Sequence, residues 1–428
     1  MIKSGAAVLD ITPPLGTLMP GLFHERRAEV IHDPLQVRSF VLESDTTGVA
    51  VVVCDLIGVS RTHLDQSKEK IKDAIGLEPS QVLICCTHTH TGAQTGKDAY
   101  TEFVVERISD SVRLAWEGRQ PAEVGWGRGT EERVVFNRRY RMKDGSARTN
   151  PGVGNPEVAE PLGPIDPEVG VLCLRQPNGG TIGLLGNYTL HYVGGGDHQQ
   201  AISADYFGLF GEFIQRMRGE SFVAALSNGA CGDINNIDVL GGARPKNDRY
   251  QHTERVAALI AAHAFWAWNE MTFSGDVPLG AEMEEVMLKR REPLSDEEMA
   301  RIRELEQQKK NLTMAERLLV WRASQQTPDL PEQVPTWVQA LRIGDLALVG
   351  VPCELFAGLG LEIKQRSPFE QTMVLELAND SLGYIPTRQA FKEGGYEATS
   401  CRFQPGVGEQ IVDKAVALLS RLYDKAFR

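Results

Sequence analysis

Two histidines, His88 and His90, lie one residue apart at the end of the apolar run "LICCTHTHTG", and the chain has only 9 histidines in its 428 residues. If the run is a strand that continues to its end, residues two apart point to the same face, with Cα atoms ~6.5–7 Å apart. Neutral imidazole is a common zinc ligand, so both rings could address one metal ion. A pair of hydrogen-bonding histidines at a strand end explains the pattern equally well.

Three further polar side chains follow apolar, strand-like runs. His191 closes "LLGNYTLH" and precedes the glycine-rich "YVGGGDH", Glu354 follows "LALVGVPC", and Tyr384 lies in "ANDSLGYIPT". In α/β proteins, ligands bind at the edge where strands run out. With His88, the pair His191 and Glu354 would form a His/His/Glu set with an open position, which is typical of a catalytic zinc site. For Glu354, a carboxylate that complements a helix dipole is the alternative.

The elements that would position these residues alternate between strand and helix along most of the chain. Buried strands are predicted within residues 48–59, 81–90, 180–193, 221–233 and 372–380, helices within 61–76 and 206–219, and a strand, turn and helix within 345–366. This alternation favours the α/β class, with a mixed or mostly parallel sheet.

Two segments interrupt the alternation. The Pro/Gly-rich residues 149–170 predict a long ordered or lid-like loop. The charged residues 294–324 predict one or two exposed helices that begin with Ser295 and Glu298 at the spacing of a capping box. We therefore expect a helical insertion at about 282–330 inside a single domain that spans residues 1–428.

Composition excludes several classes of function. The formal net charge is -12 and no Lys/Arg-rich run is present, which argues against a nucleic-acid partner. No stretch approaches the ~20 apolar residues of a membrane span, and the first residues do not resemble a signal peptide. The seven cysteines include no CxxC pair, so a reducing cytoplasm is expected. These features favour a cytoplasmic protein with a small-molecule substrate and leave a homo-oligomer open.

Seven sequence blocks occur in an order that resembles the neutral, non-lysosomal ceramidase family. The blocks are "THTHTG", "FNRR", "LH", "ISADYFG", "SNGACGDINN", "VPCELFAGLG" and "NDSLGYIPT" with "GGYEA", and the resemblance runs from about residue 5 to about residue 405. Members of that family are zinc amidases that cleave the N-acyl bond of ceramide. The resemblance implies a mixed, layered α/β sandwich of the kind that forms their catalytic domain.

The resemblance also implies roles for individual residues. It gives four zinc ligands: His88, His191, Glu354 and Tyr384. It makes His90 a neighbour that contacts substrate or a developing charge, although spacing alone would also allow His90 to bind the metal. Arg138 in "FNRR" matches the active-site arginine, which suits a carbonyl or oxyanion; a surface cation beside Arg139 is the alternative. Asp205 could orient a ligand imidazole or act as a helix N-cap.

The chain departs from the family at Asn235, which occupies the position of a serine implicated in catalysis. An asparagine cannot be an acyl nucleophile, but its amide can donate a hydrogen bond, so a water activated by the metal is the expected nucleophile. Ser227 begins the same loop but does not fall on the motif position. We expect no counterpart of the family's C-terminal immunoglobulin-like domain, and a small soluble amide is expected as the substrate in place of ceramide.

The sequence thus predicts a Zn²⁺-dependent hydrolase of an amide bond, with His90, Arg138 and Asn235 as catalytic residues. An esterase, lactonase or phosphoesterase on the same site is the alternative, as is an inactive zinc-binding relative. Rival sites would use Cys231 as a thiol nucleophile, or a second metal held by further carboxylates at strand ends. Those carboxylates are Asp10, Asp55 and Asp233.

Overall fold

The strand β4 (Gly48–Cys54) shows why the sheets stack in layers, because all of its residues are buried. Val51 and Val53 belong to the core between two layers of sheet, whereas Val52 and Cys54 belong to the core beneath helices. Successive side chains of a strand point to opposite faces, so a strand that is apolar at every position has to be covered on both sides.

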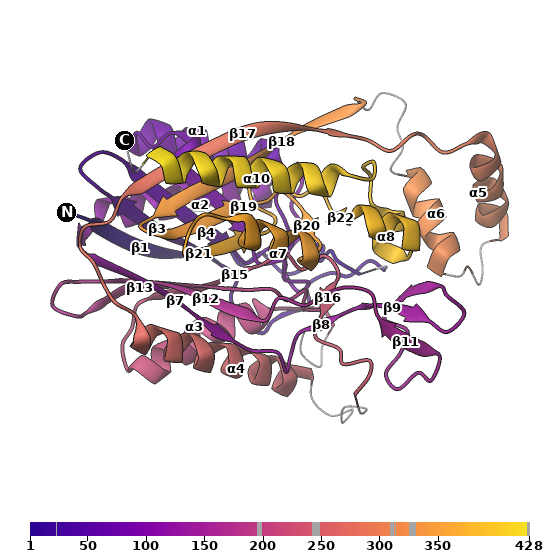
Figure 1. Ribbon diagram of the computed structural model, residues 1–428, viewed down its shortest axis with the longest axis horizontal. Coiled ribbons are helices and arrows are strands. Elements are labelled where there is room, and N and C mark those ends of the chain that lie inside the picture. The colour runs from indigo at the N-terminus through magenta and orange to yellow at the C-terminus, as the bar shows by residue number, and fades with distance from the viewer. Residues whose placement is uncertain are drawn as a thin grey trace.

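The computed structural model describes residues 1–22, 24–194, 199–241, 249–308, 312, 314–324 and 331–425, and it places two layers of sheet between two layers of helices (Figure 1). One layer contains the sheets β5-β4-β3-β1-β6 and β17-β18-β19-β21, and the other contains β15-β13-β12-β7. The strands are β1 (Lys3–Asp10), β3 (Gln36–Glu43), β5 (Val82–Cys86), β6 (Gln120–Pro121), β7 (Glu123–Thr130), β12 (Glu168–Arg175), β13 (Thr181–Tyr188), β15 (Val223–Asn228), β17 (Leu279–Lys289), β18 (Gln333–Ile343), β19 (Leu346–Gly350) and β21 (Gln371–Leu375).

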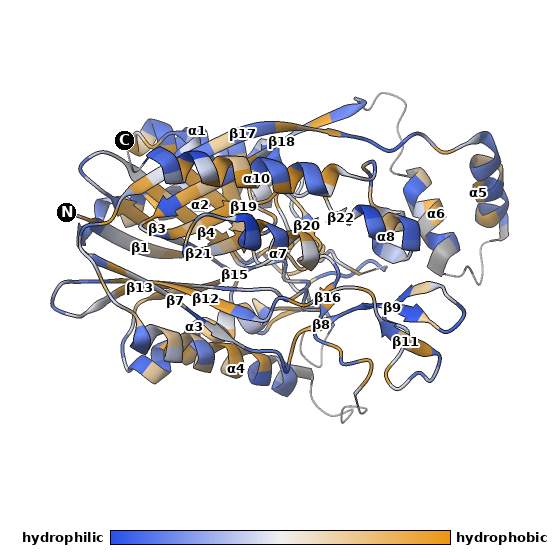
Figure 2. Ribbon diagram, viewed as in Figure 1, coloured by the Kyte–Doolittle hydropathy of each residue, from blue (hydrophilic) through white to orange (hydrophobic). Residues whose placement is uncertain are grey.

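Helices cover the outer face of each layer of sheet. The helices α1 (Arg61–Ile75) and α2 (Ala99–Glu117) pack on the first sheet, α7 (Ala357–Arg366) and α10 (Val407–Asp424) on the second, and α3 (Asp205–Arg218) and α4 (Arg249–Glu270) on the third. Figure 2 shows the same division, with apolar strands inside and mixed surfaces on the helices. None of the described helices combines the length and the apolar character that crossing a bilayer needs.

The direction of the strands partly differs from the prediction. Most neighbouring strands of the three large sheets are antiparallel, so the mixed sheet is confirmed and the mostly parallel alternative is wrong. Parallel pairing occurs between β4 and β5, β13 and β15, and β19 and β21, and each of these connections passes through a helix. Their carboxyl ends meet at one edge of the sandwich, where ligands of α/β proteins bind.

The helical insertion lies between the paired strands β17 and β18 (Figure 1). It contains α5 (Asp296–Gln308) and α6 (Met314–Ser324), and residues 309–311, 313 and 325–330 lie outside the described part. The capping box is present, because Ser295 N donates to Glu298 Oε2 (2.8 Å) and Glu298 N donates to Ser295 Oγ (3.2 Å). The predicted start near residue 282 is wrong, since residues 282–289 continue β17 as a strand.

The predicted loop 149–170 is also more structured than expected. Strand β11 (Val158–Pro161) pairs with β9 (Arg139–Met142), which pairs in turn with β10 (Ala147–Thr149). The remaining short elements are η1 (Pro79–Gln81), β2 (Val30–Ile31), β8 (Phe136–Asn137), β14 (Ala201–Ile202), β16 (Ile234–Asn235), β20 (Glu354–Leu355), β22 (Tyr384–Ile385), α8 (Arg388–Glu393) and α9 (Tyr396–Ser400).

Candidate active site

His88 and His90 meet through a turn of the backbone and not through an extended strand. Strand β5 ends at Cys86, and His88 has a left-handed backbone with φ 64°. The prediction that both side chains leave one face of a strand is therefore wrong, although the rings do converge, with centroids 4.9 Å apart. A left-handed conformation is uncommon outside glycine and is found where the surrounding structure holds the residue in place.

Backbone carbonyls determine which nitrogen of each ring carries the proton. His88 Nδ1 lies 2.8 Å from Ile57 O, and His90 Nδ1 lies 3.0 Å from Gly21 O. A carbonyl only accepts hydrogen bonds, so each Nδ1 donates, and each Nε2 is left with a lone pair. This is the tautomer in which Nε2 can bind a metal ion.

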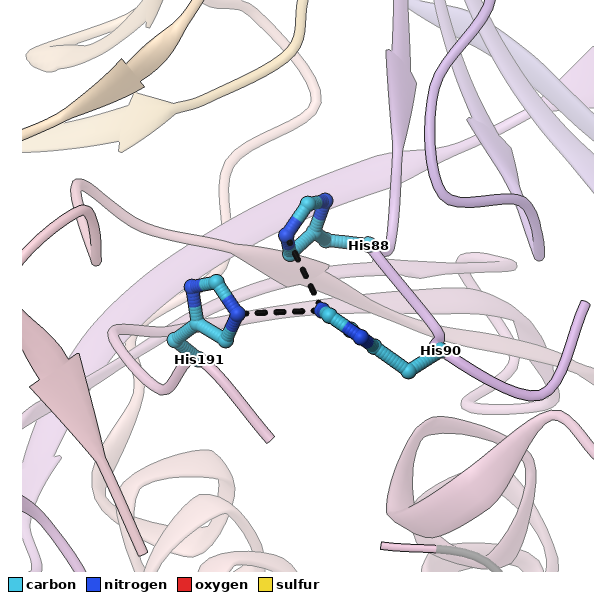
Figure 3. Close-up of side chains that lie close together, drawn as sticks. All are labelled: His88, His90 and His191. Carbon is cyan, nitrogen blue, oxygen red and sulfur yellow. Dashed lines mark hydrogen bonds between the residues drawn. The ribbon is translucent and has the colours of Figure 1, made fainter. Parts of the chain in front are cut away.

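Three Nε2 atoms come together from two distant parts of the chain, as Figure 3 shows. His90 Nε2 lies 3.3 Å from His88 Nε2 and 3.0 Å from His191 Nε2. His191 follows β13, beyond its last residue Tyr188, and is buried like the other two. Lone pairs that face one another at this distance repel unless a proton or a cation lies between them, so these three histidines form a group that can bind a metal ion.

A carboxylate offers a second set of ligand atoms that shares His88 Nε2. The parallel pair β20–β22 places Glu354 beside Tyr384. Glu354 Oε2 lies 3.3 Å from His88 Nε2 and 3.6 Å from His191 Nδ1. Both Glu354 Oε2 and His191 Nδ1 are buried without a hydrogen-bond partner. Buried polar atoms are rarely left unpaired, so these two atoms fit a ligand that binds between them.

The ligand sets differ in how they use His191 and in their charge. The three imidazoles use Nε2 of His191 and are neutral, whereas the set with Glu354 uses Nδ1 and supplies a negative charge. A divalent cation in a buried site is stabilised more by the charged set, because the carboxylate offsets the cost of removing the ion from water. A further neighbour is the half-buried Tyr384, whose ring stacks on His191 with centroids 6.2 Å apart.

The pKa values of these groups reflect burial and mutual contact. Burial alone would lower the pKa of His88, but the Glu354 carboxylate outweighs it and raises that pKa. Burial would raise the pKa of Glu354, but His88 outweighs it and lowers that pKa. Burial, and then neighbouring positive charge, lower the pKa values of His90 and His191 well below the usual range, so both rings are held neutral. Neutral rings suit metal binding and proton transfer.

Arg138 is buried against Tyr384, and the alternative of a surface cation is wrong. Its Nε donates to Glu397 Oε1 (2.7 Å), and its Nη2 donates to Gly232 O (2.9 Å). The guanidinium carbon lies 5.1 Å from the centre of the Tyr384 ring. Burial, and then the Glu354 charge, raise the pKa of the Tyr384 phenol well above its usual value, and the Arg138 charge only partly offsets this. Tyr396, which the sequence analysis did not single out, packs edge-on against Tyr384 at 5.4 Å.

The loop after β15 joins the parts of the site without supplying a nucleophile. Asn235 is buried, its side-chain amide donates to Asn150 Oδ1, and its own Oδ1 accepts from Ile237 N (3.0 Å). Burial raises the pKa of the Cys231 thiol well above its usual value, and Cys231 Sγ lies 2.8 Å from Glu376 Oε1, so a reactive thiolate is not favoured. Ser227 donates to Gly186 O (3.0 Å) within the sheet.

The carboxylates proposed for a second metal have structural partners. Asp10 Oδ1 accepts from Thr12 N (2.6 Å) in a turn, and Asp55 is buried in an ion pair with Arg38 (2.8 Å). Asp233 Oδ1 accepts from Ala357 N (2.8 Å) at the start of α7. Asp233 therefore caps this helix, which leaves Glu354 free of that role.

Residues far from the histidines in sequence hold them in position. Gly21 has φ 92°, and a Cβ there would lie 2.5 Å from His90 Nδ1, so only glycine brings its carbonyl to the ring. Arg26 Nη2 donates to His90 O (2.7 Å). Asp205 accepts from Thr89 Oγ1 (2.7 Å), so it orients the residue between the two histidines and is not an N-cap. Positive φ and long-range contacts leave no pattern in the sequence that could have identified these supports.

Comparisons with known proteins concern the sequence and the fold of the whole chain. No family model matches the chain. Neutral ceramidase of Pseudomonas aeruginosa is 22% identical over 262 residues, which are 56% of this chain and only 38% of that protein's length. The solved structure titled "Ceramidase complexed with C2" matches 99% of this chain and 75% of that chain, with 18% identity and a TM-score of 0.76. The crystal structure of neutral ceramidase from Pseudomonas aeruginosa matches 98% of this chain and 75% of the chain in that structure, with 20% identity and a TM-score of 0.75.

The resemblance inferred from the sequence blocks is confirmed by these matches, and so is the mixed α/β fold class. The chain is a relative of neutral ceramidases with their sandwich fold and a buried group of three histidines that can bind a metal ion.

Proposed function

We propose that this relative of the neutral ceramidases is a Zn²⁺-dependent hydrolase that cleaves the amide bond of an N-acyl substrate. One observation carries the proposal: His88, His191 and Glu354 lie together, and two of their buried atoms, Glu354 Oε2 and His191 Nδ1, have no hydrogen-bond partner. Imidazole nitrogens and a carboxylate are the donor set of catalytic zinc sites. The similarity to ceramidases supports an amide as the bond that is cleaved.

The proposed ligands are His88, His191, Glu354 and Tyr384. Zinc bound there would polarise the substrate carbonyl and lower the pKa of a bound water. Tyr384 lies beside Glu354 through the β20–β22 pair, and the nearby Arg138 guanidinium partly offsets the burial and the Glu354 charge that raise its pKa. Glu354 supplies the negative charge that an uncharged imidazole set lacks.

The chain's own residues would bind the substrate and move the proton. His90 is neutral, and its Nε2 points into the histidine group, so it can accept a proton from the attacking water and return it to the leaving amine. Arg138 would orient the carbonyl side through donors that Glu397 and Gly232 do not occupy. Asn235 is held by Asn150, so it supports the loop and leaves the attack to water.

The test is metal analysis of the purified chain, followed by assays on a matched panel of N-acyl amides, carboxylic esters and phosphoesters. Bound zinc and cleavage of the amides, abolished by a chelator and restored by zinc, is the expected result. Cleavage of esters alone, cleavage of phosphoesters with two bound metals, or zinc without any turnover would each contradict amide hydrolysis. A panel that runs from short to long acyl chains reports whether the substrate is a small soluble amide or a lipid.

A further inference from the structure

Glu397 lies behind the candidate site as a fully buried carboxylate at the second position of α9. Its Oε1 accepts from Arg138 Nε (2.7 Å), and its Oε2 accepts from Thr149 Oγ1 (2.8 Å). Arg139 Nε lies 3.7 Å from Oε2. A buried carboxylate is costly unless it is paired and hydrogen-bonded, so the two hydrogen bonds and the nearby charge of Arg139 explain why the fold tolerates it.

The contact with Glu397 also limits how Arg138 can move. A guanidinium is planar, so bonds at Nε and at Nη2 on different partners fix both its position and its plane. Those partners are Glu397 and the backbone oxygen of Gly232. The fixed plane lies by the ring of Tyr384, which is one of the proposed metal ligands.

Charge is balanced in the group that contains Arg138. The arginine cluster consists of Arg138, Arg139, Glu393 and Glu397, all buried or nearly so. Arg139 Nη1 pairs with Glu393 Oε2 at 3.2 Å, which leaves Glu397 as the direct partner of Arg138. Arg141 Nη2 also lies 3.7 Å from Glu393 Oε1, but Arg141 is matched by Glu160 at 3.0 Å, so cations and carboxylates remain equal in number. Arg138 offers hydrogen-bond donors to the site while its charge is already matched.

The helical insertion supports the element that carries Glu397. Helix α6 packs against α9, and Arg291 Nη1 donates to Ala398 O (3.0 Å). A short helix of five residues would not hold a buried carboxylate in place alone, because isolated helices of that length are unstable. The insertion therefore fixes where Glu397 lies.

We infer that Glu397 is a positioning residue that also determines specificity: it holds Arg138 against Tyr384 and cancels its charge, so the site favours a neutral amide over a carboxylate. The inference rests on the proposed amide hydrolysis, in which the substrate is neutral and one product is a carboxylate. An unmatched guanidinium in a buried site would bind that product by a charge-assisted hydrogen bond and retain it. With Glu397 present, the product leaves more easily.

The experiment compares Glu397→Gln with the matched control Glu393→Gln, which removes a buried carboxylate from the same cluster without touching Arg138. The probes are hexanoate and hexanamide, which have the same length and differ in charge. Their binding to the zinc-loaded protein is measured by calorimetry, so the result does not depend on turnover. The measured quantity is the ratio of hexanoate affinity to hexanamide affinity. This ratio is expected to rise about tenfold over wild type in Glu397→Gln and to keep the wild-type value in Glu393→Gln.

An equal ratio in the two variants would overturn the inference. If Glu397→Gln does not fold, the double variant Arg138→Gln with Glu397→Gln replaces a charged pair by a neutral one and tests the same point. It is expected to keep the wild-type ratio, because the charge of Arg138 was already cancelled. A tenfold loss of hexanoate binding in the double variant would show that Arg138 acts as a free cation. Failure of amide turnover in the substrate panel would contradict the proposed function. The binding ratios would still test whether Glu397 cancels the charge of Arg138, because they do not depend on turnover.

Discussion

Two neighbouring groups of buried polar residues differ in how their atoms are paired. In the histidine cluster, formed by His88, His90, His191 and Glu354, lone pairs face one another, and Glu354 Oε2 and His191 Nδ1 have no hydrogen-bond partner. In the arginine cluster, each arginine has a carboxylate within 3.2 Å, although Arg139 Nε also lacks a hydrogen-bond partner. Burial of the side chains is similar in both clusters. The difference teaches that acceptor atoms facing one another, and not burial or one unpaired donor, mark a place for a cation, whereas opposite charges in contact hold the fold together.

The largest effect is expected when the histidine cluster loses its charge. Glu354→Gln removes the carboxylate that offsets a divalent ion, so zinc affinity should fall by more than about 100-fold, beyond the 10–100-fold cost of mutating a residue that only supports a ligand. Amide turnover should fall with it. Zinc content and a chelator competition measure the change.

Glu376→Gln is the matched control for that experiment. Glu376 is fully buried near the same site, and burial raises its pKa to about 8, so at pH 7 glutamine resembles its neutral form. Zinc affinity close to wild type is expected. Equal zinc loss in both variants would mean that Glu354 has no special part in binding the metal.

A variant of His90 shows which of the two ligand sets binds the metal, because His90 belongs only to the set of three imidazoles. In His90→Ala, the set with Glu354 is intact, so zinc should remain bound at one ion per chain while turnover falls by about 10²–10⁴-fold, the usual contribution of a general acid–base group. Metal analysis and the amide assay are run on one preparation. If zinc is lost together with activity, the three imidazoles bind the metal and the proposed role of His90 is wrong.

In the arginine cluster, a substitution should affect stability more than metal binding. Arg139→Met leaves Glu393 without its buried partner, and breaking a buried ion pair costs about 3–5 kcal/mol. Denaturant unfolding compares it with Arg113→Met, whose side chain is 41% exposed and pairs with Glu117 on the surface of α2. The control should cost under ~1 kcal/mol. Similar losses for the two variants would contradict the distinction between the clusters.

Lys68 extends the comparison to a buried charge that has no carboxylate within ion-pair distance among the described residues. Its Nζ has Met283 Sδ as a neighbour at 3.9 Å, and burial lowers its pKa to about 7. Since the pKa of an unfolded lysine is about 10.4, the unfolded chain binds more protons between these values, and stability rises with pH there.

Lys68→Met should therefore stabilise the protein, by about 1–3 kcal/mol at pH 7 or below, and the gain should disappear as the pH approaches 10.5. Thermal unfolding of the two proteins across pH 6–10 measures it. A difference in melting temperature that stays constant over this range would show that packing, and not charge, is responsible.

The sequence predicted more of the fold than of the site's detail. The strand–helix alternation led to the α/β class, and the block order led to the relatives and to the layered sandwich. A prediction failed where distant segments decide the local backbone, since His88 leaves the strand in a left-handed conformation. For Arg138, the contact with Glu397, which lies 259 residues away, contradicts only the alternative of a surface cation. Tyr396 and Glu397 were missed because neither lies at the end of a strand-like run.

The sequence alone determined the strands that are apolar on both faces and the candidate metal ligands that follow them, because residue type and period are local properties. The tertiary structure decided which atoms of those side chains meet. The carbonyls of Ile57 and Gly21 choose the protonated nitrogen of each histidine, and the pairing of β20 with β22 sets Glu354 beside Tyr384. Such choices depend on hydrogen bonds between segments that only folding brings together.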